Sequence, residues 1–157
     1  MKINWKQTLA VRTFGLTKIP LILFVRPTVY ILDAEQCVLG IRLKRRTQNH
    51  LYSLYFGTLA IGADLASGLL AMEMIKRSNR RISLVFKDMQ ANFLKRVDAD
   101  AIFTCTDGPK IDDLIQKVIE TGERQHQSIK INVTAPAKYG EEVLAEFSLT
   151  LSLKLKG

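Results

Sequence analysis

Residues 49–68 read Asn-His-Leu-Tyr-Ser-Leu-Tyr-Phe-Gly-Thr-Leu-Ala-Ile-Gly-Ala-Asp-Leu-Ala-Ser-Gly. From Tyr55 the pattern becomes helical and is apolar on nearly all sides as far as Lys76, which is typical of a buried helix. Glycine in a helix interior costs up to about 1 kcal/mol relative to alanine, so its repeated use indicates that strands or a ligand approach closely. The glycines in question are Gly57, Gly62 and Gly68.

One carboxylate, Asp64, lies near the middle of this apolar helix. Burial removes hydration from a carboxylate, so an acid in such a place costs free energy unless it is paired or hydrogen-bonded. Acids with a perturbed pKa gather at functional sites, which makes Asp64 the first candidate for chemistry. The alternative is a structural acid that bonds backbone amides or pairs with an arginine.

Alternating apolar and polar residues on both sides of the helix predict strands. The predicted strands cover residues 28–33, 37–44, 82–94, 99–106, 127–135 and 143–156. Further helices are predicted over residues 3–16 and 109–121, the second with Asp107 as its cap and Gly122 at its end. Long alternating strands and one wholly apolar helix predict an α+β fold in which an antiparallel sheet of about six strands wraps around that helix.

The chain of 157 residues is 47% apolar and 24% charged, which is ordinary for one globular domain. No repeat or linker divides it, so we expect a single domain over residues 1–157 with a helical extension at residues 1–25. No uninterrupted apolar run is long enough to span a membrane, and no cleavage pattern follows the N-terminus. These features favour a cytoplasmic protein without a transmembrane segment. An amphipathic helix within residues 3–25 that touches lipid or a partner stays open.

The two cysteines, Cys37 and Cys105, lie in alternating apolar runs and lack the spacing of metal ligands. We therefore expect no metal site. Buried free thiols in a reducing compartment are the favoured interpretation of this pair. A disulfide between them stays open.

The net charge of +8 is unevenly distributed along the chain. Residues 1–96 contain 16 Lys/Arg and 5 Asp/Glu, whereas residues 97–157 contain 7 and 10. Basic groups at residues 42–46 and 76–81 would attract the phosphates of nucleic acid, anionic lipid or a nucleotide-bearing substrate. They are equally consistent with solvated loops and helix ends. No motif for RNA or DNA binding is present, so we expect no specific nucleic-acid partner.

The order of elements resembles the hotdog fold, and within it the acyl-CoA thioesterases of the phenylacetate-pathway type. It resembles even more a family of uncharacterised hotdog proteins that are usually labelled as thioesterases. The motif of those enzymes has Asn, then His-Gly-Gly six residues on, then Asp at the seventh residue after the second Gly. Asn49, Gly57 and Asp64 match this spacing, whereas Tyr55 and Phe56 replace the His and the first Gly.

The resemblance implies hydrolysis of an acyl-CoA or acyl-carrier thioester, with Asp64 as general base or nucleophile. A backbone amide of Gly57 or Phe56 would stabilise the oxyanion, and Asn49 would hold water or the carbonyl. It also implies a dimer, and in some relatives a tetramer, with the site at the interface. No cofactor is implied, because coenzyme A is part of the substrate. The predicted substrate-binding residues are Tyr55, Phe56, Ser67, Arg80 and Arg81.

Several of these residues also have structural interpretations. Asn49 and His50 suit a loop, and Tyr55 and Phe56 suit core or interface packing. No Gly-x-Ser-x-Gly elbow is present, which argues against a serine hydrolase. Because Tyr55 and Phe56 depart from the motif, a non-catalytic protein that binds acyl-CoA or a fatty acyl group is the alternative function.

Overall fold

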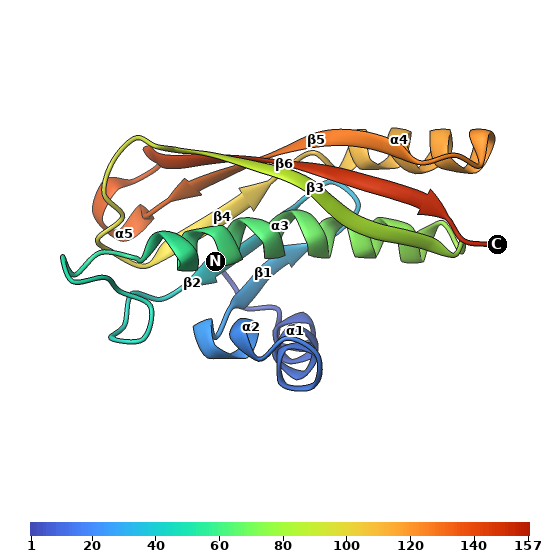
Figure 1. The fold of residues 1–157 in the computed structure, drawn as a ribbon. Helices are drawn as coiled ribbons and strands as arrows, with labels where there is room; N and C mark the ends of the chain where they lie inside the picture. The colour runs from blue at the N-terminus through green and yellow to red at the C-terminus, as the bar shows by residue number, and fades with distance from the viewer.

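The computed structural model covers residues 1–157. The chain folds into six strands and five helices (Figure 1). The strands are β1 (Thr28–Leu32), β2 (Cys37–Ile41), β3 (Ile82–Phe93), β4 (Ala101–Cys105), β5 (Gln125–Thr134) and β6 (Val143–Leu155). The helices are α1 (Trp5–Thr17), α2 (Pro20–Val25), α3 (Phe56–Arg77), α4 (Gly108–Thr121) and α5 (Pro136–Tyr139).

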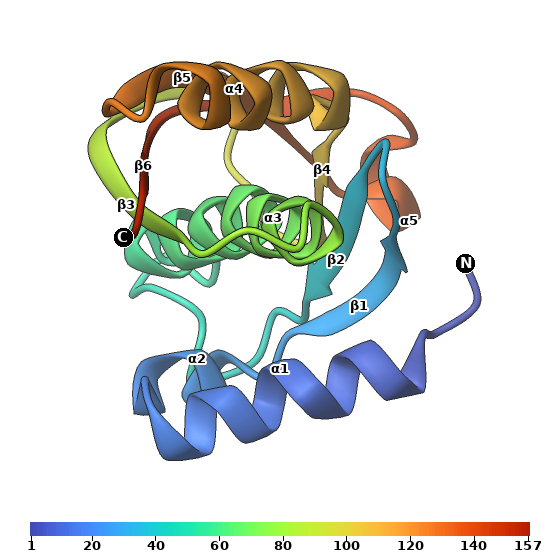
Figure 2. The same cartoon turned by 90° about the vertical axis from the view of Figure 1, so that its right-hand side faces the viewer.

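All six strands form one antiparallel sheet in the order β1-β2-β4-β5-β6-β3. The sheet curves around α3, which lies along its concave side (Figures 1 and 2). The alternating residues of β6 that face α3 are fully or almost fully buried, from Ala145 to Leu153. The predicted α+β fold, a curved antiparallel sheet around a central helix, is therefore confirmed.

The strand β3 forms one edge of the sheet and pairs only with β6. Its register shifts by one residue between Phe86 and Asp88, so Lys87 is the extra residue of a β-bulge. Before the bulge Phe86 lies opposite Leu151, and after it Met89 lies opposite Leu149. Since residues opposite one another share a face of the sheet, the bulge keeps Phe86 and Met89 on the concave side.

Two short helices were not predicted from the sequence, and the capping role predicted for Asp107 is wrong. The short helices α2 and α5 begin at Pro20 and Pro136, where proline is compatible with a first helical turn. Asp107 stands at the start of α4 but does not cap it, because its carboxylate accepts the backbone N–H of Lys130 at 2.8 Å and pairs with Lys110 at 2.9 Å. Gly122 ends α4 in the left-handed conformation, as predicted.

The expectation that no segment could span a membrane is wrong for α3 on length and composition alone. This helix has 22 residues and is apolar enough to cross a bilayer. More than half of its most apolar window is nevertheless buried inside this domain, where the sheet surrounds it. Burial by the sheet accounts for its apolar surface, as for the core helix of a globular domain.

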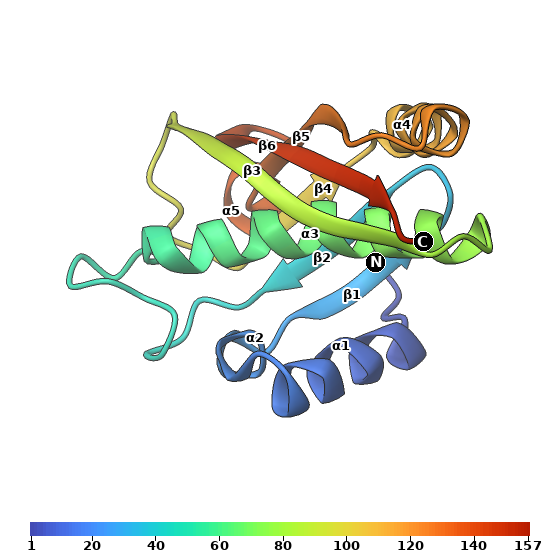
Figure 3. The same ribbon diagram turned by 45° about the vertical axis from the view of Figure 1, so that its right-hand side comes forward.

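The helices α1 and α2 form a separate layer beside β1, on the side of α3 away from β5 and β6 (Figure 3). Three apolar side chains hold this layer to the core, namely Val11, Ile22 and Val25. The hydroxyl of Thr8 also accepts the backbone N–H of Val29 at 2.9 Å, and the backbone N–H of Asn4 donates to the Val29 carbonyl at 2.9 Å. The N-terminal extension is thus fixed to the edge strand β1.

Candidate functional site

Asp64 lies in an apolar groove of about 530 Å³ between α3, the α1–α2 layer and the start of β3. On α3 the groove follows one face of the helix from Asp64 to Lys76, about 18 Å along the helix axis. We call it the Asp64 groove. Its lining residues are Phe14, Ile19, Ile22, Asp64, Leu65, Gly68, Leu69, Met72, Ile75, Lys76, Ile82, Leu84 and Phe86.

The carboxylate of Asp64 has no hydrogen-bond or ion-pair partner in the chain. Burial raises the pKa of Asp64 above its ordinary range, because the groove withholds water from the charged form. Gly68, one turn further along α3, leaves the carboxylate uncovered, since a Cβ there would stand 4.0 Å from Asp64 Oδ1. An unpaired, partly desolvated carboxylate that faces an apolar cavity is suited to accept a proton.

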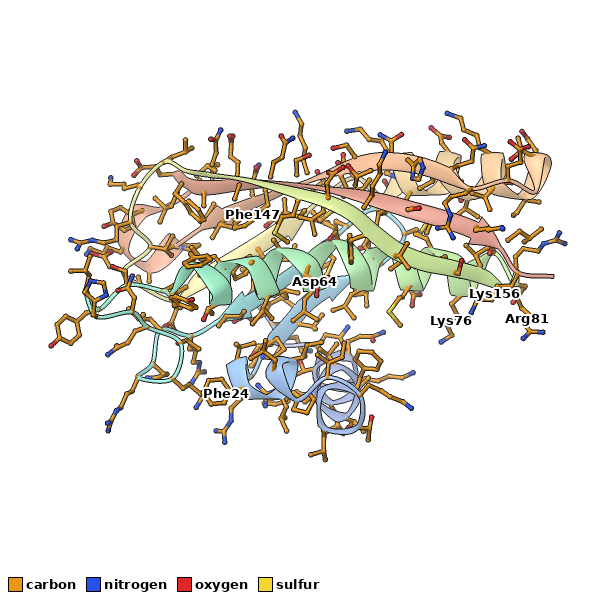
Figure 4. All side chains as sticks on the ribbon, viewed as in Figure 1. Phe24, Asp64, Lys76, Arg81, Phe147 and Lys156 are labelled. Atoms are coloured by element: carbon orange, nitrogen blue, oxygen red, sulfur yellow. The ribbon has the colours of Figure 1, made fainter.

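Basic side chains gather at the C-terminal end of α3, where the groove ends. Figure 4 shows Lys76, Arg81 and Lys156 at this end of the molecule, with Asp64 further along the helix. The predicted binding residues Arg80 and Arg81 follow in the turn before β3 and are exposed. None of these cations forms an ion pair within the chain, whereas the neighbouring Arg77 is paired with Glu73 at 3.0 Å. They remain available to an anionic group.

A second cavity, of about 550 Å³, lies at the N-terminal end of α3. It is lined by Asn49, Tyr55 and Phe56 and by residues 93–97 after β3. Asn49 closes the preceding loop, because its side-chain oxygen accepts the backbone N–H groups of Leu51 at 2.9 Å and Ser53 at 3.2 Å. Asn49 therefore closes the loop through its side-chain oxygen, while its side-chain NH₂ stays free to donate and its role in a site stays a prediction.

The first turn of α3 presents backbone N–H groups without acceptors. Those of Phe56, Gly57 and Thr58 form no hydrogen bond within the chain, whereas that of Leu59 donates to the Tyr55 carbonyl. Unsatisfied N–H groups at a helix N-terminus carry partial positive charge and suit an oxyanion. The ring of Tyr55 packs over Gly57, however, since a Cβ on Gly57 would lie 2.5 Å from it. Access to these groups therefore depends on where that ring stands.

Asp64 and the free N–H groups lie on one face of α3 but two turns apart. Seven residues separate Gly57 from Asp64, which corresponds to about 10 Å along the axis. A base and an oxyanion donor that act on one carbonyl must both lie about 3 Å from the reacting atoms. One protomer therefore does not assemble the predicted catalytic residues into a single site.

Ser67 does not belong to either cavity, so the prediction that it binds substrate is wrong for this structure. Its side chain is fully buried, and its hydroxyl donates to the Ala63 carbonyl at 3.0 Å. Sequence reasoning also missed the groove residues that come from outside the motif. Phe14, Ile19 and Ile22 belong to the N-terminal extension, and only the docking of that extension beside α3 brings them near Asp64.

No group of three or more His, Cys, Asp or Glu side chains lies close enough together to hold a metal ion. Cys37 and Cys105 lie directly opposite one another on β2 and β4, and both are buried free thiols. The predicted burial of two free thiols is therefore confirmed, and the reducing compartment stays a prediction. Burial raises the pKa of Cys105 to about 11, and that of Cys37 is raised as well by the same cause.

This fold recurs in solved structures. A Pseudomonas aeruginosa protein of unknown function, PA5026, described as "Probable Thioesterase", is 22% identical with a TM-score of 0.79, over 95% of this chain and 96% of that one. Zebra fish thioesterase superfamily member 2 is 15% identical with a TM-score of 0.65, over 100% and 99% of the two chains. The protein thus shares the fold of these solved structures, the hotdog fold.

The Chlorobaculum tepidum protein OLEI01261, of unknown function, is 12% identical with a TM-score of 0.82, over 98% of both chains. A comparison with curated proteins finds no relative similar in sequence. A family profile described as "Domain of unknown function (DUF4442)" matches residues 8–153, which is nearly the whole chain. The chain belongs to this family.

Proposed function

We propose that this protein is an acyl-CoA thioesterase whose catalytic site forms between two copies of the chain. The observation that carries the proposal is the unpaired carboxylate of Asp64 in an apolar groove, on the helix whose first turn has free N–H groups. These are the general base and the oxyanion donors that thioester hydrolysis needs. The proposal is also supported by the solved structures of the same fold that are named as thioesterases.

In the proposed reaction Asp64 takes a proton from water as the water oxygen bonds to the thioester carbonyl carbon. The backbone N–H of Gly57 or Phe56 stabilises the oxyanion that forms. When the oxyanion collapses, the carbon–sulfur bond breaks, and the proton held by Asp64 passes to the departing thiolate. The products are a carboxylic acid and the free thiol of the carrier, so every atom of water and thioester is accounted for.

A second copy is needed because the two catalytic groups of one α3 lie about 10 Å apart. The free edge of β3 supports such pairing, since its outer N–H and C=O groups are unpaired over a strand of 12 residues. Met89 and Phe93 on its concave side are 43% and 55% exposed, although β6 residues of the same face are buried. Pairing of two β3 strands would cover these side chains and place α3 of one copy beside α3 of the other.

The remaining features fit the parts of the substrate. The apolar Asp64 groove suits an acyl chain, because burial of each CH₂ contributes about 0.8 kcal/mol. The unpaired cations Lys76, Arg80 and Arg81 suit the phosphates of coenzyme A through charge-assisted hydrogen bonds. An acyl chain on a carrier protein would present the same thioester. We favour coenzyme A because its phosphates would pair with these cations.

The second candidate is a protein that binds acyl-CoA without hydrolysing it. The ring of Tyr55 over Gly57 favours this candidate, because it covers the N–H groups that would stabilise an oxyanion. Tyr55 and Phe56 also stand where the resembling enzymes have His-Gly. The two candidates share the groove and the cations and differ only in turnover.

The test is release of free thiol from a panel of acyl-CoAs with short, long and aryl acyl groups. The wild type is compared with Asp64→Asn, and with Asp113→Asn on α4 as a matched control for loss of an exposed acid. Release by the wild type and the control, with a loss of about 100-fold or more in Asp64→Asn, supports hydrolysis. No release, with a thermal shift on addition of acyl-CoA, supports the binding protein. Neither release nor a shift contradicts both.

A further inference from the structure

The α1–α2 layer carries large apolar side chains that the fold leaves exposed. In α1 the fully or nearly buried residues are Thr8, Val11 and Gly15, two of which offer little apolar surface. Several larger apolar side chains of this segment face solvent instead. Those more than half exposed are Trp5, Leu9, Leu16, Leu21 and Phe24.

Three of these residues form one stripe along α1. Trp5, Leu9 and Leu16 are separated by four and seven residues, which places them within about 40° of one another around the helix. Each is about two-thirds exposed, at 66%, 67% and 66%. Leu21 and Phe24 extend the apolar surface onto α2, where Figure 4 shows Phe24 on the outer layer, away from the sheet. Exposed apolar side chains that lie together on a surface are typical of an interaction site.

The charges around this surface have one sign. The first 32 residues contain five basic side chains and no Asp or Glu, the first acid being Asp33. Four of the basic residues are exposed, namely Lys2, Lys6, Lys18 and Arg26. Arg12 is partly buried and bonds the Pro27 carbonyl at 3.0 Å, and its pKa is lowered first by burial and then by the nearby charge of Arg26. The layer therefore combines an apolar surface with a positive field.

We propose that the α1–α2 layer binds the surface of an anionic lipid bilayer, with Trp5, Leu9 and Leu16 entering the interface and Lys2, Lys6 and Lys18 facing the headgroups. Basic side chains close to an anionic bilayer are attracted by about 1 kcal/mol each, and the exposed apolar side chains beside them can then enter the interface. A second copy of the chain is the less favourable occupant, since a self-complementary contact would bring the same cations together without acids to pair them. This proposal is independent of the proposed hydrolysis.

The chain carries its own probe for this contact, because Trp5 is its single tryptophan. The experiment adds vesicles of phosphatidylcholine, with or without about a third of phosphatidylserine, to the full-length wild type at low salt. We expect the emission of Trp5 to shift to shorter wavelength and its quenching by acrylamide to fall, with the anionic vesicles only. High salt should reverse the change, because it screens the attraction.

Two sets of variants separate the apolar and the charged contributions. Leu9→Ser with Leu16→Ser should abolish co-sedimentation with anionic vesicles, whereas Leu51→Ser, which removes an exposed leucine elsewhere, should not. Lys6→Gln with Lys18→Gln should weaken vesicle binding about tenfold or more. The matched control is Lys117→Gln with Lys130→Gln, which removes the same charge from α4 and β5 and should leave binding unchanged.

Three outcomes would overturn the proposal. One is an unchanged emission of Trp5 with anionic vesicles at low salt. Another is equal binding to neutral and anionic vesicles by wild type and variants alike. The third is a blue shift that follows protein concentration without lipid, together with a fall in molecular mass in Leu9→Ser with Leu16→Ser. That last result would assign this surface to a second copy.

Discussion

The ring of Phe103 on β4 lies directly against Gly62 of α3, where a Cβ would come within 2.3 Å of it. Phe103 is fully buried at the middle of the sheet, so its ring cannot move aside without disturbing its neighbours. The closeness of sheet and helix at this point depends on the missing side chain. The sequence pattern indicated such an approach, and the structure identifies strand β4 as the element that makes it.

Gly62→Ala should therefore destabilise the protein by about 1–3 kcal/mol, because overpacking against Phe103 outweighs the better helix propensity of alanine. The matched change Gly68→Ala meets Phe86 at 3.6 Å and Asp64 Oδ1 at 4.0 Å, which are ordinary contacts. It should be neutral or stabilise the fold by up to about 1 kcal/mol. Urea unfolding of both variants checks this expectation, and equal destabilisation would contradict it.

Asp64→Asn should stabilise the fold at neutral pH, by about 0.5–1 kcal/mol. The pKa of Asp64 is raised in the folded state, so its contribution to stability is greatest below the unfolded pKa and is lost as pH rises through the folded pKa. The gain from Asp64→Asn should therefore shrink as the pH falls below the ordinary range of an aspartate. Free energies of unfolding between pH 3 and pH 8 test this, and a difference independent of pH would argue that burial does not penalise the charge.

Cys37 and Cys105 should resist thiol reagents in the folded protein. Both side chains are buried and their pKa values are raised, so little thiolate is accessible. Titration with Ellman's reagent should detect almost no thiol in native protein and two thiols per chain after denaturation without reductant. Fewer than two thiols in the denatured chain would instead indicate a disulfide between the paired positions of β2 and β4.

Arg80→Gln with Arg81→Gln should raise the KM for acyl-CoA about fivefold at low salt, if the protein is the proposed thioesterase. The loss should be smaller at high salt, since screening weakens the contribution of exposed charges in the wild type. An acyl-N-acetylcysteamine thioester has no phosphate and should show no such difference. Lys117→Gln with Lys130→Gln is the matched control, and an equal effect there would point to net charge alone.

Met89→Glu should lower the molecular mass of the protein in solution, because a charge on the concave side of β3 would be buried by the proposed pairing of two β3 strands. Val85→Glu is the control, since Val85 lies on the convex face of the same strand and is also half exposed. Sedimentation or light scattering measures both. A change of mass in the control alone would place the contact on the other face.

The strands and the central helix could be predicted because their apolar residues alternate or recur as the sheet and helix require. The geometry around Asp64 could not be predicted from the sequence. The groove depends on how α1 and α2 dock beside α3, and neither helix has a sequence relation to Asp64. Ser67 was misjudged because a hydroxyl within an apolar helix can face a cavity or bond its own backbone, and the sequence does not distinguish the two. Asp107 failed as a cap because β5, distant in sequence, supplies a better donor.

The bulge at Lys87 determines which residues of the edge strand β3 face α3. Upstream of it the even-numbered residues of β3 face α3, and downstream of it the odd-numbered ones do. If β3 ran on without the bulge, with Lys87 as an ordinary strand residue, its outer half would shift by one residue, so that Gln90 and Asn92 would turn inward and Met89 and Phe93 outward. The bulge thus decides whether this free edge of the sheet presents apolar side chains or amide side chains on its concave face.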